Sequence, residues 1–281
     1  MVARAQGRDF SVAQNPITAD ELRGLDFVFV KATEGDASFN VLPGQGTPVK
    51  NGVDPNFAHN WAVAKQAHIP LGAYHVLHPD RSAAKQAELF VDTVRAHGLA
   101  AGDILVNDVE IEGGDVDDAA LKFCNETRRL AGPLHPVLAY ANQNFGRRLL
   151  KTAARYPGVW FAHPSDEEPT TDFIAPFTHW VFFQFGEINR VDADKFHGTK
   201  EDLKDWIARF LVPPKAPEPF NEDHLRHLWH IVHTGEADLR QRQLQTLWID
   251  FFAGLAMKPN PDAHEQHVLT FAQHVLHVEL V

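Results

Sequence analysis

The chain of 281 residues contains a single cysteine, Cys124, which excludes a disulfide bond within the chain and fits a reducing compartment. It contains no apolar run approaching the ~20 residues that a membrane-spanning helix needs. Acidic residues outnumber basic ones, for a formal net charge of −11. Since no basic stripe appears either, we expect no nucleic-acid partner. The first seven residues lack the apolar core of a secretory signal, so we expect synthesis in the cytoplasm without a signal peptide.

Three common kinds of catalytic or cofactor site are also missing. No Gly-rich phosphate loop follows the first predicted strand, and no G-x-S-x-G nucleophile elbow occurs. No set of His, Cys and acidic residues has the spacing of a zinc site. These absences argue against an open dinucleotide-binding sheet, against serine-hydrolase chemistry and against a metal centre. We therefore expect neither a metal site nor a cofactor.

The segment Ile104–Glu110 is a short apolar run that ends in two carboxylates, Asp108 and Glu110. Because side chains alternate along a strand, both acids project to the same side, with Cα atoms roughly 6.6 Å apart. Paired carboxyl groups cleave glycosidic bonds at separations of roughly 5 to 9.5 Å. Their mutual repulsion raises one pKa, so that an acid and a carboxylate coexist near neutral pH. The alternative is an acidic strand end that merely meets solvent.

Strand-like and helix-like segments alternate from residue 7 to about 211, which indicates a mainly parallel sheet with helices outside it. Seven apolar runs are predicted to be strands: Arg8–Val12, Phe27–Ala32, Pro70–Val76, Ile104–Glu110, Pro136–Ala141, Val159–His163 and Trp180–Phe185. Helices are predicted at Asn56–Ala67, Ser82–His97, Asp117–Leu130 and Lys200–Phe210. Thr18 and Glu21 form a capping box, which is typical of a helix start. Seven or eight strands favour a closed barrel, with few helices around its second half.

The C-terminal part of the chain has a different character from residues 1–211, which form the predicted barrel. Residues 212–220 include four prolines within seven positions and are predicted to be a stiff, extended linker. Residues 221–281 show apolar positions at helical spacing and are predicted to be a small all-α module. Since such a unit is marginal alone, we expect it to pack on the barrel or self-associate.

Barrel enzymes gather their functional groups at the C-terminal ends of the strands. Here those ends carry carboxylates, aromatic rings and an amide, namely Asp9, Glu34, Tyr74, His75, Asp108, Glu110, Tyr140, Trp160, Gln184 and Asp192. Aromatic faces stack on pyranose rings, and carboxylates and amides bind hydroxyl and acetamido groups, so this set predicts a sugar-binding cleft. The three aromatic residues could instead fill the core, and His75 could be structural. Asp194 is predicted to lie in a turn, without a catalytic role.

Seven segments carry a resemblance to a known family in their order along the chain: Gly7–Ser11, Phe27–Gly35, Asp54–Phe57, Gly72–His75, Asp108–Glu110, Phe183–Phe185 and Val191–Phe196. Over residues 3–211 the chain resembles glycoside hydrolase family 25, the Chalaropsis-type lysozymes common among phage endolysins and bacterial muramidases. The resemblance implies a modified TIM-type (β/α) barrel with five βα units followed by β strands. It also implies cleavage of the β-1,4 bond between N-acetylmuramic acid and N-acetylglucosamine in bacterial peptidoglycan.

The same resemblance implies a role for each acid. Glu110 corresponds to the proton donor for the leaving oxygen. Asp108 corresponds to the residue that orients the substrate's 2-acetamido group for attack on the anomeric carbon, an exception to the two-carboxylate schemes. Either Asp108 or the acetamido group is the nucleophile, and the sequence does not decide between them. Asp9 and Asp192 correspond to two further acids of the cleft.

The sequence departs from the family pattern in several places. Arg8 stands where an aliphatic residue is usual, Phe183 replaces a usual Trp, and Val76 replaces an aromatic residue. Asn107 is a polar residue on the face of its strand that should pack against helices. Residues 36–53 make a longer connection than usual, which is predicted to be a flexible loop near the cleft mouth. None of these departures removes a carboxylate.

The family resemblance implies a phage lysin that reaches the wall after holin-mediated release or lysis, or that travels on the virion. Two other classes of function remain open. The first is a non-catalytic barrel that binds peptidoglycan as a lectin does. The second is a virion or assembly component that acts through residues 221–281.

Overall fold

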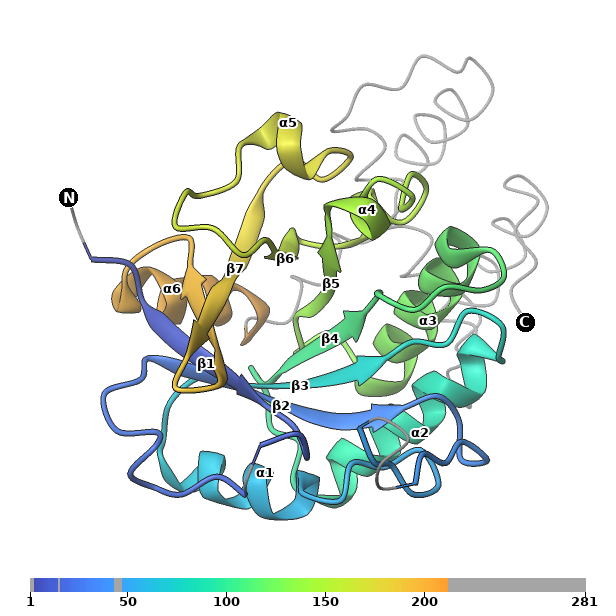
Figure 1. The fold of residues 1–281 in the computed structure, drawn as a ribbon, viewed down its shortest axis with the longest axis horizontal. Coiled ribbons are helices and arrows are strands. Elements are labelled where there is room, and N and C mark those ends of the chain that lie inside the picture. Colours follow the sequence, from blue (N-terminus) through green and yellow to red (C-terminus); the bar gives the residue numbers. More distant parts are fainter. Residues whose placement is uncertain (1–2, 15, 43–46, 212–281) are drawn as a thin grey trace, which may run out of the picture. The chain divides into compact units, whose positions relative to one another are not determined.

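The computed structural model describes residues 3–14, 16–42 and 47–211, so the predicted linker and helical module lie outside the described residues. Eight strands form a closed barrel in sequence order (Figure 1). They are β1 (Gln6–Phe10), β2 (Phe27–Glu34), β3 (Leu71–Val76), β4 (Ile104–Asp108), β5 (Val137–Asn142), β6 (Val159–Ala162), β7 (Trp180–Ile188) and β8 (Val191–Phe196). Strands β1 to β7 pair in parallel, whereas β8 is antiparallel to both β7 and β1.

A helix follows each of the strands β2 to β6, and another follows β8. These helices are α1 (Phe57–Gln66), α2 (Ala83–Ala96), α3 (Val116–Ala131), α4 (Gln143–Gly146), α5 (Thr171–Ile174) and α6 (Lys200–Leu211). Helices α1 to α3 flank the first half of the barrel, while α4 and α5 have four residues each (Figure 1). The predicted modified TIM-type barrel, with a thin helical layer in its second half, is confirmed. Of the helices described, none is long and apolar enough to cross a bilayer.

One predicted helix start leads to no helix. The capping-box bonds between Thr18 and Glu21 do form, from Thr18 N–H to Glu21 Oε2 at 2.8 Å and from Glu21 N–H to Thr18 Oγ1 at 3.4 Å. The residues that follow are turns closed by hydrogen bonds three residues apart. Gly24, with φ of 84°, ends the segment after little more than one turn. So short a segment does not offset the cost of helix nucleation.

The alternation of side chains along the strands creates two separate apolar cores. One fills the barrel interior, where the Phe29 ring stacks on Trp160 with centroids 4.3 Å apart and meets Phe182 edge-on at 4.9 Å. The other lies between the strands and the helices and includes Phe90 of α2 and Phe123 of α3. The interior core closes the lower part of the barrel, so only the end where the parallel strands terminate is left for a site.

Two glycines make room for the phenyl rings in the barrel interior. A Cβ atom at Gly72 would lie 2.3 Å from a ring carbon of Phe29, and one at Gly7 would lie 2.3 Å from the ring of Phe27. We expect Gly72→Ala to lower the free energy of unfolding by about 1–3 kcal/mol, because overpacking displaces the ring and the strand. Urea denaturation measures this change. Gly146→Ala is the control, since its Cβ would meet its nearest atom at 3.8 Å; equal stability of the two variants would contradict the packing argument.

Candidate active site

The C-terminal ends of the parallel strands surround a cavity of about 280 Å³. All four predicted catalytic acids line it, together with four of the predicted substrate-binding residues: Asp9, Asp108, Glu110, Asp192, Tyr74, Tyr140, Trp160 and Gln184. Ser11, Lys31, Thr47 and Val76 complete the lining. The fold thus brings together acids that lie far apart along the chain.

Strand geometry places each of the four acids. Asp108 is the last residue of β4 and follows the inward-facing Val106, while Glu110 lies two residues farther along, beyond the strand. Asp9 and Asp192 are directly opposed across the antiparallel pair of β1 and β8. Asp9 and Asp108 are each 5% exposed, whereas Glu110 is open to solvent at the mouth. The cavity therefore has buried acids at its base and an accessible acid at its rim.

The surroundings of these acids favour their protonated forms. Burial raises the pKa of Asp9 to about 8, and the charge of Asp192 adds to the effect. Burial also raises the pKa of Asp108 well above its usual value, and the charge of Glu110 adds to it. Partial desolvation raises the pKa of Glu110, while the positive charge of Lys31 acts against the rise. The site can therefore hold a proton on a carboxyl group near neutral pH, as general acid catalysis requires.

One oxygen of Asp108 is left available for a ligand. Its Oδ1 atom is buried and receives no hydrogen bond from any described residue. An unpaired buried polar atom is costly, and a substrate N–H that reaches it would remove that cost. The atom is therefore suited to accept a hydrogen bond from bound substrate.

A short hydrogen-bond chain orders one wall of the cavity. The Tyr140 hydroxyl donates to Gln184 Oε1 at 2.8 Å, and Gln184 Nε2 donates to Asp9 Oδ2 at 2.8 Å. Trp160 lies below Tyr140, with ring centroids 4.8 Å apart. Because Trp160 is only 2% exposed, it forms the floor of the cavity rather than an open platform for a sugar ring. Tyr140, which is half-buried, is the better placed of the two to touch a ligand.

His75 does not line the cavity, and of the two roles that the sequence left open for it, its position fits the structural one. Tyr74 and His75 are neighbours in β3, and adjacent residues of a strand face opposite sides, so only Tyr74 can face inward. The His75 ring is fully buried, with Nδ1 2.8 Å from Thr33 Oγ1 and Nε2 3.2 Å from Gln86 Oε1. Burial lowers its pKa to about 3, so His75 is a neutral structural residue.

Glu34 also lies outside the cavity lining, and Lys31, which the sequence analysis missed, takes its place. Lys31 Nζ lies 2.6 Å from Glu34 Oε2, and His78 Nε2 lies 3.1 Å from Glu34 Oε1. Burial raises the pKa of Glu34, but the His78 hydrogen bond and the Lys31 charge outweigh it, so the pKa falls. Alternation could have found Lys31, because it continues the inward series of Phe27 and Phe29.

Asp194 does not lie in a turn, contrary to the prediction. It sits within β8 and is fully buried. The turn comes earlier, at Asn189 and Arg190, which both have positive φ values of 56° and 66°. Trp160 Nε1 donates a hydrogen bond to Asp194 Oδ1 at 2.8 Å. Asp194 is thus part of the barrel interior beneath the cavity floor.

Two of the departures from the family pattern have local partners. Arg8 points away from the cavity, and its Nη1 donates to the backbone oxygens of Ile188 at 2.6 Å and Val191 at 3.2 Å. It therefore ties down the two-residue turn between β7 and β8. Asn107 Nδ2 donates to the Tyr156 hydroxyl at 2.9 Å in the outer core. Both residues stabilise the barrel wall without entering the site.

The long connection after β2 lies at the cavity, as the sequence predicted, because Thr47 is one of the lining residues. Its described parts are held by hydrogen bonds. The backbones of Val41 and Val49 exchange two, at 3.0 and 3.1 Å. Arg81 also binds Asp36 in an ion pair of 3.1 Å. This loop contributes to the rim of the cavity.

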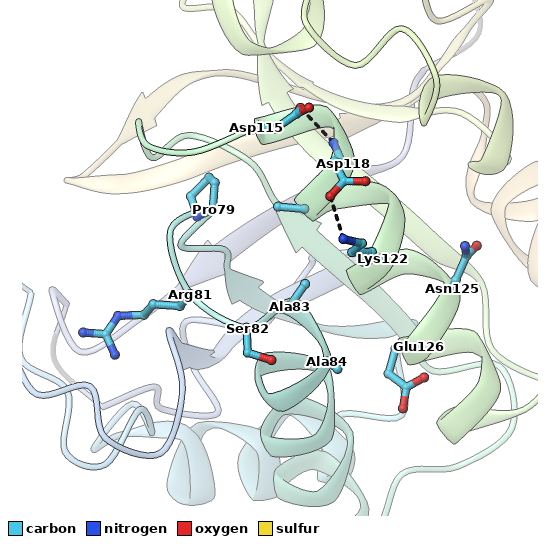
Figure 2. A pocket seen from close by; sticks show the side chains of 11 residues that line it. Pro79, Arg81, Ser82, Ala83, Ala84, Asp115, Asp118, Lys122, Asn125 and Glu126 are labelled. Atoms are coloured by element: carbon cyan, nitrogen blue, oxygen red, sulfur yellow. Dashed lines mark hydrogen bonds and ion pairs between the residues drawn. The ribbon is translucent and has the colours of Figure 1, made fainter. Parts of the chain in front are cut away.

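A larger hollow of about 500 Å³ lies outside the barrel between α2 and α3 (Figure 2). Its charged side chains already have partners within the chain. Asp115 Oδ1 accepts from the Asp118 N–H at 3.1 Å, Lys122 Nζ lies 2.8 Å from Asp118 Oδ2, and Arg81 binds Asp36. Across the described ranges, no three His, Cys, Asp or Glu side chains are placed to hold a metal ion. The barrel cavity is therefore the stronger candidate.

A closed α/β barrel with several carboxyl groups and aromatic rings at the ends of its strands defines a barrel of the glycoside-hydrolase class. The model of the family "Glycosyl hydrolases family 25" matches residues 8–194. The chain belongs to this family, which confirms the resemblance found in the sequence.

Individual proteins are also similar to this chain. The chain is 28% identical over 202 residues to the uncharacterized protein YegX of Escherichia coli K12, and the match covers 68% of this chain and 66% of YegX. The structure of a family 25 glycosyl hydrolase from Bacillus anthracis matches with a TM-score of 0.56 at 24% identity, over 71% of this chain and 92% of that one. A bacterial lysozyme from Streptomyces coelicolor matches with a TM-score of 0.60 at 23% identity, over 75% and 100%. These two structures share the fold.

Proposed function

We propose that the protein is a peptidoglycan hydrolase, and specifically a muramidase that cleaves the β-1,4 bond between N-acetylmuramic acid and N-acetylglucosamine. Membership of glycosyl hydrolases family 25 supports the class of reaction. The observation that carries the proposal is the placement of Asp108 and Glu110 in one cavity with Asp9 and Asp192. The lysozyme of Streptomyces coelicolor, which shares the fold, is consistent with a wall substrate.

Asp108 at the end of β4 and Glu110 just beyond it have environments that suit different roles. Glu110 is at the accessible rim and has a raised pKa, so it can donate a proton to the oxygen of the leaving sugar. Asp108 is buried deeper, and its free Oδ1 can accept a hydrogen bond from the acetamido N–H of the muramic acid residue. That contact orients the acetamido oxygen toward the anomeric carbon. The acetamido oxygen then bonds to the anomeric carbon while the bond from that carbon to the leaving oxygen breaks and Glu110 protonates the leaving oxygen. Water next attacks the anomeric carbon, which opens the cyclic intermediate and returns a proton to Glu110.

Digestion of purified peptidoglycan tests the proposal. We expect loss of turbidity and new reducing ends that mass spectrometry identifies as N-acetylmuramic acid. Reducing ends of N-acetylglucosamine would indicate a glucosaminidase instead, and new peptide termini without new reducing ends would indicate an amidase. If the protein co-sediments with the walls but does not clear them, the lectin alternative holds and the proposed activity is wrong.

Lys31 and Glu34 set the charge next to the acids, which gives a prediction about pH dependence. Lys31 lowers the pKa of Glu110 and Glu34 raises it. In Lys31→Met the positive charge is lost, so the pKa values of Glu110 and Asp108 rise further. Because cleavage needs Glu110 protonated and Asp108 ionised, we expect both limbs of the pH–rate profile to move to higher pH. Initial rates of wall clearing across the pH range measure the shift.

The double variant Lys31→Met/Glu34→Gln is the matched control for this prediction. It removes one positive and one negative charge from an ion pair whose side chains are only 6% and 12% exposed. The net charge beside Glu110 is then that of the original protein, so the profile should move back toward its original position. An unshifted profile in Lys31→Met would show that the lysine does not influence the acids.

We also propose that the substrate is reached after release from the cytoplasm through a holin pore or by lysis, or from the virion. Residues 221–281, for which we expect wall binding or self-association, lie outside the described residues. Light scattering of the full chain tests self-association. A monomer at all concentrations would argue against it.

A further inference from the structure

Asp194 is an acid buried in the barrel interior, one layer below the cavity. Its side chain is 0% exposed, and its backbone pairs with Gly7 of β1 on one side and with Gln184 of β7 on the other. Trp160 Nε1 donates to its Oδ1 atom at 2.8 Å. The Oδ2 atom receives no N–H or hydroxyl hydrogen bond from the described residues. A buried carboxylate with only one neutral donor would be poorly compensated.

Asp9 is the diagonal neighbour of Asp194 on the inner face of the antiparallel pair of β1 and β8, because Gly7 lies opposite Asp194 and Asp9 lies opposite Asp192. Two ionised carboxylates at such neighbouring buried positions repel each other and can only accept hydrogen bonds, so at least one member of this pair carries a proton. Burial and the charge of Asp9 raise the pKa of Asp194 well above its usual value. Asp194 is fully buried and has one neutral donor, whereas Asp9 lines the cavity and accepts a hydrogen bond from Gln184. These surroundings favour the proton on Asp194.

We propose that Asp194 is a positioning residue that acts as a neutral acid, donating a hydrogen bond to the Asp9 carboxyl group and accepting one from the Trp160 indole. This proposal rests on the proposed function, because Asp9 and Trp160 both line the sugar cavity. Asp9 then receives two hydrogen bonds, from Asp194 and from Gln184 Nε2 at 2.8 Å. Both donors hold its carboxyl group in one orientation.

The floor of the cavity depends on the same acid. Trp160 is held in place by Asp194 at its nitrogen, by stacking on Phe29 at 4.3 Å and by the edge of Tyr140 at 4.8 Å. An ionised Asp194 would instead repel Asp9 on the neighbouring strand β1 and Asp192 two residues earlier in β8. Only a group with one donor and one acceptor satisfies both neighbours. A protonated carboxyl group has this pattern, an amide has it too, and an aliphatic side chain lacks it.

Two substitutions of Asp194 test whether the site needs a side chain that both donates and accepts a hydrogen bond. In Asp194→Asn the amide can donate to Asp9 and accept from Trp160, so we expect the wall-clearing rate at pH 7 to stay within about threefold of the original. In Asp194→Leu neither bond can form, and we expect a loss of at least about tenfold in kcat with altered tryptophan fluorescence. Loss of activity in Asp194→Asn as large as in Asp194→Leu would overturn the proposal. Should the leucine variant fail to fold, the asparagine variant alone decides.

The pH dependence of the Tm tests, independently of catalysis, whether Asp194 carries a proton in the folded protein. The pKa of Asp194 is higher in the folded than in the unfolded protein, so the folded state holds an extra proton and loses stability as pH rises above about 4. Asp194→Asn has no such proton to lose. We expect its Tm to exceed that of the original protein by a few degrees at pH 7 and to match it near pH 4. The titrating groups around this position, Asp9, Asp192 and Tyr140, are the same in both proteins.

The two measurements distinguish failure of this inference from failure of the proposed function. If the original protein does not cleave walls, the proposed function is wrong, but the difference in Tm between pH 4 and pH 7 still reports on the Asp194 proton. If Asp194→Asn is less stable than the original protein at pH 7, Asp194 acts as an anion, and the inference is overturned whatever the activity.

Discussion

Glu110→Gln is expected to reduce the rate of peptidoglycan cleavage by about 10³-fold or more while binding to the wall persists. An amide has the shape of the acid but no proton to give to the leaving oxygen, and general acid catalysis contributes about 10²–10⁴-fold to such reactions. The rate can be followed as release of soluble muropeptides by liquid chromatography. Co-sedimentation with intact walls reports binding, which depends on the rest of the cavity.

Glu112→Gln is a suitable control because Glu112 is a neighbouring acid that does not line the cavity. It lies on the surface, where it pairs with Arg148 at 2.8 Å and its side chain is 69% exposed. We expect this variant to cleave walls at the original rate. A near-normal rate in Glu110→Gln would show that another group donates the proton, and the roles given to the acids of β4 would have to be reassigned.

The second large effect is expected for Asp108→Asn, with a loss of about 10²–10³-fold in kcat. A charged acceptor aimed at the acetamido N–H supports the positive charge that develops in the transition state, and removing one such preorganised group costs about this much. Because burial raises the pKa of Asp108, its charged form is costly in the folded protein. The neutral Asn variant should therefore be at least as stable as the original, and its Tm shows that lost activity is not lost folding.

The identity of the nucleophile can be tested with the same assay. If the acetamido group attacks, walls whose muramic acid residues are N-deacetylated should resist the original protein. If Asp108 attacks directly, such walls remain substrates and a covalent sugar adduct on Asp108 should be trapped by mass spectrometry.

Most of the barrel was predictable because its strands are apolar runs that alternate with helical patterns. Strand β8 was not among the predicted strands, since three of the six residues of Val191–Phe196 are charged and the segment contains no apolar run. Two of these charged residues, Asp192 and Asp194, face other polar groups of the interior rather than solvent. A search for apolar runs therefore missed this strand, because polar residues of the barrel interior interrupt it. Of these two acids, Asp192 also lines the cavity.

The candidate site was predictable where strict alternation holds and not where the backbone departs from it. Asp108 and Glu110 follow the alternation of β4 and reach one cavity. In β2 the register shifts between Lys31 and Thr33, a bulge that no residue type in the sequence announces. The shift pairs Thr33 with the outward-facing His75. Alternation alone predicts that His75 faces the side opposite to its neighbour Tyr74.

The tight turn at Asn189 and Arg190 limits where the barrel can accept inserted residues. In a barrel with eight parallel strands, the seventh strand would lead into a long loop over the opening, a position that tolerates insertions. Here the chain reverses within two residues, and Arg8 secures both ends of the reversal. Growth of the polypeptide at this point would separate the two backbone oxygens that Arg8 binds. Adaptation to longer or branched glycans, in nature or by engineering, should therefore come from the connection after β2, where Thr47 lines the cavity.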